Sequence, residues 1–482
     1  MSTVGLVENI QEASLGWLGE TPAECLDFLQ KIKNYQLREG ETNYLKPDAS
    51  EFDDYKYAML PEKHLIQPRE LSEEFLRGGY TKYDNPNFFS RFANTKAFVH
   101  DYFSGVFEVD KRRIHLTSLP FLSLNAVCSK FSDSEHIVFI NQGMLSILPL
   151  IYNEILPTFD PKTFGPSKPG FFNRLIDIYC SAYVSDKGVA HFGGQVELFH
   201  IGENWYFRRQ LRQHLVKKTV AATKQPEPWK IPLSSDSAKY YANRGAITFL
   251  LAHEFAHAYL DHADARAATS EIRRSQSEIE AARKLLTEAG FRDVQIQRSL
   301  DRNHAYLVEQ PIEKEADFWA LGATVSLCEK LELEDAAARC LIFGALVMFY
   351  AWEIYDRVIL MTRVGFEAAD REISREQEFR NIVYGCTHPI SSSRVHYLVE
   401  EVKRRSGPEG QNLVDFIQSA DDMMKFNLDQ MWPHLGHYEK DISKYVKESP
   451  YMEDMPEEVF EGLNAIGVSD FCRPVKYWAE MK

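Results

Sequence analysis

Residues 245–260 have the sequence GAITFLLAHEFAHAYL, an apolar stretch interrupted by two histidines and one acidic residue. Its length, its apolar character and its lack of proline predict a buried helix. His253 and His257 are four residues apart, so their rings lie on one helix face, one turn apart. Two imidazoles placed in this way can bind one zinc ion, with Glu254 beside a water on that ion as the general base. The alternative is a core helix whose two histidines are only hydrogen-bonded.

His262 is the nearest candidate for the third protein ligand that a catalytic zinc site needs. On a straight helix its side chain, five residues after His257, points in a different direction. The metzincin pattern HExxHxxGxxH also does not fit, because this chain has Leu260 and Ala263 where that pattern has glycine and histidine. We therefore expect His262 to lie at the surface or to support one of the ligands.

Glu313 and Asp317 are better candidates, because a glutamate and an aspartate four residues apart share one face of a helix. We expect Glu313 to bind the metal and Asp317 to hold the tautomer of a ligand ring, that of His253. Glu315 lies off this face and is expected to be a solvent-exposed carboxylate; it replaces Glu313 as ligand if the register differs. The alternative for the whole segment is a charged helix start, where acidic residues are favourable.

The pairing of HExxH at 253–257 with ExxxD at 313–317 resembles the gluzincin zinc peptidases. The chain is most similar to the branch with the CAAX-processing and heat-shock membrane proteases, and to soluble relatives that include the Lit-type phage-exclusion peptidases. The resemblance covers about residues 115–400, without the membrane helices of that branch. It implies a zincin-like metallopeptidase core, a small sheet with the site helices packed on it.

A further similarity is the segment Thr387-His388-Pro389 with Arg394 five residues after the proline, which is like the THPxxxxR element of these peptidases. The resemblance implies that Arg394 supports the site. It also implies that His388 polarises the substrate carbonyl or stabilises the oxyanion, alone or with Tyr384. The alternative is an ordinary His-Pro turn with a structural hydrogen bond.

Residues 114–131 and 136–145 are rich in β-branched and apolar side chains, and the polar residues 132–135 separate them. This pattern predicts two strands joined by a turn. Residues 124–127, with the sequence LNAV, resemble the family's edge strand, which could bind a peptide by strand addition. The alternative is an ordinary core hairpin.

The composition is that of a folded globular protein, with 482 residues, a formal net charge of −15 and seven scattered cysteines that form no CxxC. These features argue against nucleic-acid binding and a disulfide framework, and predict a cytoplasmic location. The N-terminus has no signal-peptide pattern. The apolar run at 340–352 is too short to span a bilayer and predicts a buried core helix rather than membrane insertion.

The predicted fold class is α+β and predominantly α, with helical extensions at both ends of the core. We expect a helical N-terminal region over 1–111 and a zincin-like domain over 112–402 that contains a helical insertion over 263–306. A helical C-terminal region over 403–482 would follow a linker near Arg404.

The predicted function is zinc-dependent endopeptidase activity on protein or peptide substrates, with one Zn2+ per chain and Glu254-assisted attack of a metal-bound water. Two alternatives stay open. One is a zincin-fold regulator, sensor or toxin-like defence protein that acts on one specific partner. The other is a zinc hydrolase for a non-peptide amide or ester. The substrate, the trigger and the oligomeric state are not predicted.

Overall fold

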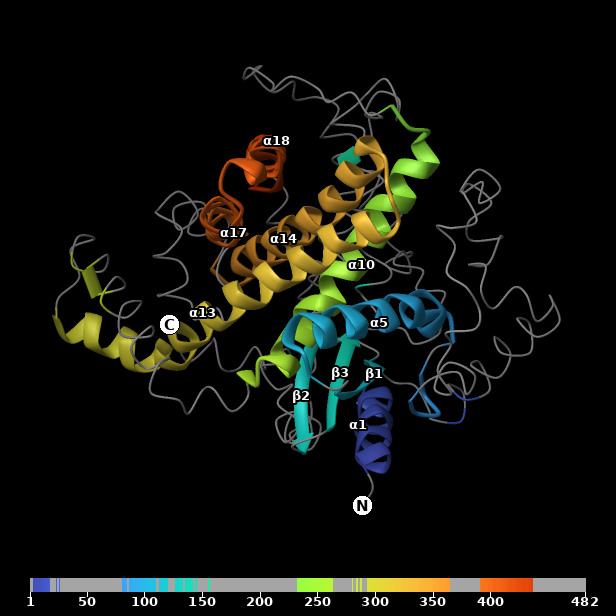
Figure 1. The fold of residues 1–482 in the computed structure, drawn as a ribbon. Coiled ribbons are helices and arrows are strands. Elements are labelled where there is room, and N and C mark those ends of the chain that lie inside the picture. The colour runs from blue at the N-terminus through green and yellow to red at the C-terminus, as the bar shows by residue number, and fades with distance from the viewer. Residues whose placement is uncertain are drawn as a thin grey trace, which may run out of the picture.

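In the computed structural model, the described residues form a mostly helical protein with one small sheet (Figure 1). This confirms the predicted class, α+β and predominantly α. Apart from a few single positions, the described ranges are 3–17, 80–84, 86–109, 112–119, 126–132, 135–141, 232–262, 293–364 and 391–436.

The sheet has three strands, β1 (Arg113–Leu119), β2 (Ala126–Ser132) and β3 (Glu135–Asn141), in the order β1-β3-β2. β3 pairs parallel with β1 and antiparallel with β2. The prediction of two strands was therefore wrong, because the first apolar stretch forms two strands that flank the third. Pro120 follows β1 directly and lacks the N–H that a strand needs to continue its ladder. Among the described strands, β1 and β2 therefore form the two edges of the sheet.

Helix α10 (Ser235–Tyr259) lies at the centre of the fold. It packs against α13 (Asp293–Lys330) and α14 (Asp335–Val364), and also against α5 (Pro86–Phe107) and strands β2 and β3. In Figure 1 this green helix runs from the sheet and α5 up along the α13–α14 pair. Because α10 carries the HExxH sequence, the motif lies where the sheet and the helices meet.

Two glycines allow α10 and α14 to approach until their backbones touch. A Cβ atom on Gly245 would lie 1.7 Å from the carbonyl oxygen of Leu341, and one on Gly344 would lie 1.8 Å from that of Ala242. Any other residue would force the two helices apart, since the obstacle on each side is main chain. The contact therefore sets the position of the HExxH helix.

Helix α14 is apolar enough over Asp335–Glu353 to cross a membrane by length and composition alone, but 72% of that window is buried inside the protein. Its side chains belong to the main hydrophobic cluster, which they share with α10, α13 and α18 (Gln411–Gly436). The prediction of a buried core helix for residues 340–352 is therefore confirmed.

The predicted insertion and linker both overlap continuous helices. α13 begins at Asp293 and passes through residue 306, the expected end of the insertion, with Pro311 inside the helix. At the expected linker, α17 (Ser391–Ser406) continues into a 3-10 turn, Gly407–Gly410, and then α18. α18 packs back on α14, where the hydroxyl of Tyr350 donates to the Asp421 carboxylate.

The N-terminal helix α1 (Thr3–Trp17) reaches the sheet through a buried polar network. The amide of Gln11 donates to the Ser118 carbonyl at 2.8 Å and accepts from the Thr81 hydroxyl at 2.7 Å. Asp84 accepts from the backbone amides of Thr81 and Ser118, both at 2.8 Å. Burial raises the pKa of Asp84 to about 6. This carboxyl group therefore titrates in a mildly acidic range.

Candidate metal centre

The helix that carries HExxH starts with a side-chain cap and is buried over most of its second half. The hydroxyl of Ser234 accepts from the Ser237 amide at 3.2 Å, which satisfies one of the first orphan N–H groups. From Ala246 to Ala256 every residue is buried. A rigid, buried helix of this kind can hold the two histidine rings with little freedom.

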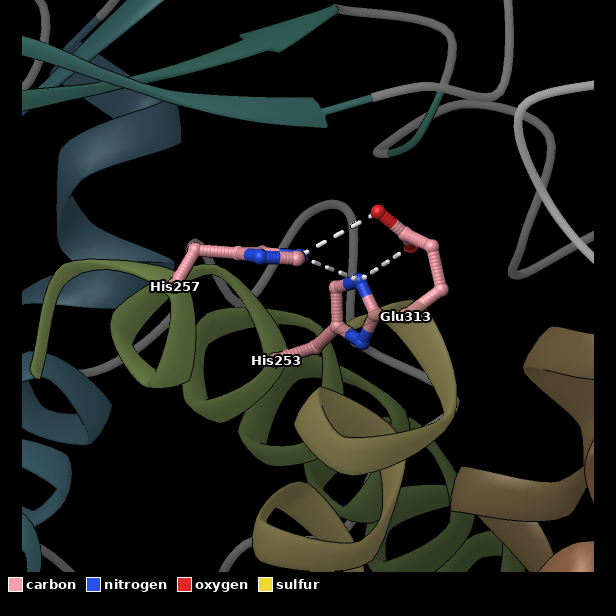
Figure 2. A group of neighbouring side chains, drawn as sticks. All are labelled: His253, His257 and Glu313. Atoms are coloured by element: carbon pink, nitrogen blue, oxygen red, sulfur yellow. Dashed lines mark hydrogen bonds and ion pairs between the residues drawn. The ribbon is translucent and has the colours of Figure 1, made fainter. Parts of the chain in front are cut away.

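Three donor atoms converge from α10 and α13 (Figure 2). The Nε2 atoms of His253 and His257 are 3.2 Å apart. Glu313 places one carboxylate oxygen 3.2 Å from the Nε2 atom of His253 and the other 3.5 Å from that of His257. Among the described residues, these three form the one group of this kind whose ligand atoms could hold a metal ion.

The separations between these donor atoms are close to those that a tetrahedral ion imposes on its ligands. Zinc binds histidine nitrogen and carboxylate oxygen at about 2.0–2.2 Å, and tetrahedral angles then place neighbouring ligand atoms about 3.3–3.6 Å apart. The two Nε2 atoms are 3.2 Å apart, and each faces a different oxygen of Glu313, at 3.2 Å from His253 and 3.5 Å from His257. The donor set of two imidazoles and one carboxylate is therefore already close to the geometry that a bound ion requires.

His253 is oriented by a buried carboxylate that an arginine holds in turn. Its Nδ1 atom lies 3.0 Å from Asp317, the contact expected from the sequence. Arg394 donates two hydrogen bonds to the Asp317 carboxylate, one from Nε at 2.6 Å and one from Nη2 at 2.5 Å. The guanidinium lies 4.9 Å from the ring centre of Phe349 and 4.6 Å from that of Trp352. Arg394 thus acts on the site through Asp317 rather than by contact with the ligand atoms.

The field at His253 favours a positive charge. Burial by itself lowers the pKa of this imidazole, but the carboxylates of Asp317 and Glu313 outweigh burial and raise the pKa to about 10. The same negative potential that attracts a second proton to the ring attracts a metal cation to the point that the ring faces.

His257 is backed by His262, whose Nδ1 atom lies 2.9 Å from the Nδ1 atom of His257. The expectation of a surface position was wrong, since His262 is buried, whereas support of a ligand agrees with this contact. The straight-helix premise fails because α10 ends at Tyr259 and Asp261 adopts a φ of 53°, which turns the chain back. Arg112 holds Asp261 with two hydrogen bonds, at 2.5 and 2.8 Å.

The sequence reasoning missed Arg112 and Asp261, which hold the turn that brings His262 next to His257. Aspartate is one of the few residues that enter the left-handed region readily, so its place at the end of an apolar helix is the local signal that could have predicted the turn. Arg112, in contrast, lies 149 positions from Asp261 in the chain, and no local pattern links the two.

When both rings are neutral, the Nε2 lone pairs of His253 and His257 face each other. A neutral ring of His253 that donates its Nδ1–H to Asp317 presents a lone pair at Nε2, and His257 does the same when it donates to His262. Both lone pairs then face each other and the Glu313 carboxylate, an arrangement that is repulsive unless a cation or a proton lies between them. The residues therefore fit a metal ion, and a proton on the Nε2 atom of His253 would satisfy the same lone pairs in the metal-free protein.

Glu254, the predicted base, is buried and follows His253, one of the three candidate ligands, directly in the chain. Burial raises its pKa to about 7, and the negative charge of Glu313 adds to this rise. His253 and the backbone amide of Cys128 on β2 lower the pKa and partly offset it. A carboxylate with a pKa near neutrality can both accept and release a proton in the neutral range.

The remaining predicted residues fall into two groups. Glu315, the substitute ligand, is outside the three-donor group and lies 3.8 Å from the Nε2 atom of His262. His388, Tyr384 and Asn125 lie outside the described residues, so their roles stay predictions.

No family model, curated protein or solved structure matches this chain. The meaning of the site therefore depends on its own geometry and chemistry.

Proposed function

We propose that this protein is a zinc-dependent endopeptidase of the gluzincin type. The observation that carries the proposal is the convergence of the Nε2 atoms of His253 and His257 with the Glu313 carboxylate, which together could hold one metal ion. Two imidazoles and one carboxylate, with a fourth position left for water, are a donor set typical of catalytic zinc in peptidases.

In this proposal Glu254 is the general base. When bound, zinc supplies a water of lowered pKa and polarises the scissile carbonyl. Glu254 accepts the proton of the attacking water and delivers it to the leaving amine. Its burial keeps competing water away, and a neighbouring cation would favour its ionised form over the neutral one.

The edge strand β2 is the proposed docking site for the substrate. β2 contacts α10, the helix that carries both histidines, and Figure 2 shows strands of the sheet above the three side chains. A strand at the edge of a sheet can bind an extended peptide through main-chain hydrogen bonds, which would align a scissile bond along the site. This mode favours endopeptidase activity on extended segments of protein substrates.

The substitution Glu254→Gln tests the chemistry separately from metal binding. We expect the purified variant to hold one zinc ion, as the wild type does, and to lose hydrolysis, because an amide cannot accept the proton. Glu400→Gln is the matched control, since this exposed carboxylate on α17 pairs with Lys403 outside the three-donor group and its loss should keep both zinc and turnover. Turnover by zinc-loaded Glu254→Gln would exclude Glu254 as the base.

Metal analysis of the wild type beside Glu313→Ala and Glu315→Ala tests the ligand set. Loss of zinc in Glu313→Ala alone supports the proposed site, whereas loss in Glu315→Ala alone would mean that the register is wrong. A proteome digestion with and without chelator then separates the functional alternatives. Broad cleavage supports an endopeptidase, one cleaved protein supports a switch or toxin, and zinc without any cleavage supports a binding role or a non-peptide substrate.

A further inference from the structure

The contact between His257 and His262 has a defined direction if His257 binds metal. We propose that His262 is a positioning residue that accepts the Nδ1 proton of His257 and so fixes the tautomer of this ligand. The proposal rests on the proposed metal site. It adds a role for a residue outside the HExxH and ExxxD motifs.

The proton positions follow from the geometry. The Nε2 atom of His257 faces His253 and Glu313, so a metal would bind there and the ring proton must lie on Nδ1. That nitrogen lies 2.9 Å from the Nδ1 atom of His262. His262 must therefore offer a lone pair at Nδ1 and carry its own proton on Nε2. A carboxylate oxygen of Glu315 lies 3.8 Å from this Nε2 atom, which is beyond hydrogen-bond distance.

The turn that returns His262 to the site is held from the sheet. Asp261 has a φ of 53°, a conformation that costs free energy for a residue other than glycine. The two hydrogen bonds from Arg112, the residue before β1, hold Asp261 in this conformation. His262 is only 4% exposed, so its ring is held in a packed position. The contact with His257 is thus built by tertiary structure and does not depend on a mobile surface side chain.

The two ligand histidines are oriented by acceptors of different chemistry. His253 faces a carboxylate that Arg394 holds, whereas His257 faces a second imidazole. A neutral imidazole accepts a proton through one nitrogen only, so this partner selects one tautomer of His262 as well as one of His257. Loss of a partner that orients a metal ligand typically lowers metal affinity about 10- to 100-fold.

Two substitutions separate positioning from simple packing. His262→Asn keeps a hydrogen-bond acceptor at the δ position, while His262→Leu has a similar branched shape without any acceptor. We expect His262→Leu to bind zinc about 10- to 100-fold more weakly than the wild type, and His262→Asn to stay within about 3-fold. The affinity is measured on the full chain by competition with a zinc-binding dye, a readout that needs no substrate.

The control is His115→Leu, which removes a partly buried histidine on β1 whose ring contacts Glu135 at 3.3 Å and which is not part of the three-donor group. Its zinc affinity should equal that of the wild type. Equal weakening in His262→Leu and His262→Asn, or no weakening in either, overturns the positioning role. Wild-type protein that binds no zinc would overturn the metal site itself, so the two failures are distinguishable.

Nitrogen NMR of the zinc-loaded wild type gives an answer that does not depend on the folding of any variant. With labelled histidine, we expect His257 to be protonated at Nδ1, and His262 to be unprotonated at Nδ1 and protonated at Nε2. A protonated Nδ1 on His262 would reverse the direction of the hydrogen bond and overturn the proposal.

Discussion

Arg394→Met should destabilise the protein by about 3–5 kcal/mol, because it breaks one side of a buried ion pair. Arg394 and Asp317 have side chains that are 1% and 0% exposed, and two hydrogen bonds of 2.5 and 2.6 Å join them. Without the guanidinium, the Asp317 carboxylate stays buried with His253 as its remaining ionic partner. Methionine keeps much of the volume between the aromatic rings of Phe349 and Trp352, so the loss reports the charge pair rather than a cavity.

The assay is urea denaturation of the metal-free protein, followed by circular dichroism, for Arg394→Met, Asp317→Asn and the double variant. We expect the double variant to lose less than the sum of the two single variants, with a coupling energy of about 2–3 kcal/mol. The matched control is Arg404→Met, which removes an arginine that also makes two hydrogen bonds to a carboxylate, that of Glu401, but is 63% exposed. It should cost less than about 1 kcal/mol.

Two results would refute this reasoning. One is a loss in Arg394→Met no larger than the loss in Arg404→Met, which would mean that burial adds nothing to the pair. The other is additivity of the single variants within about 0.5 kcal/mol, which would mean that Arg394 and Asp317 do not stabilise the fold through each other.

Three further predictions concern stability. Gly344→Ala should lower the free energy of unfolding by at least roughly 1–3 kcal/mol, because its Cβ atom would meet the Ala242 carbonyl. Gly105→Ala on α5, whose Cβ atom meets open space, should raise the free energy of unfolding by about 0.5–1 kcal/mol. Urea denaturation measures both changes. The raised pKa of Asp84 means that the folded protein keeps a proton that the unfolded chain releases, so the free energy of unfolding should fall by about 2–3 kcal/mol between pH 4 and 6. Asp84→Asn should lose this slope, and an unchanged slope would contradict the assignment. Zinc at about 100 times its Kd should raise the free energy of unfolding by about 2.7 kcal/mol, seen as a higher melting temperature in a thermal shift assay. The same zinc-dependent rise in Glu313→Ala would argue against Glu313 as a ligand.

Part of the fold was predictable because it depends on local patterns. The apolar helix that contains HExxH, the helix around ExxxD and the apolar run at 340–352 follow from periodicity and from the absence of helix breakers. The strand count was predicted incorrectly, because strands flanking 120–125 pair with a third strand rather than with each other. Pairing partners in a sheet depend on long-range contacts, which local composition does not encode.

By itself, the sequence determined which side chains share a helix face: His253 with His257, and Glu313 with Asp317. This follows from the 3.6-residue period of the helix and needs no tertiary contact. Only the tertiary structure decided that the two faces meet at one point, that Arg394 holds Asp317, and that His262 returns to support His257. These contacts depend on the packing of α10 against α13 and α14 and on a turn held from the sheet. Such distances between segments far apart in the chain are set by the packing of the whole core.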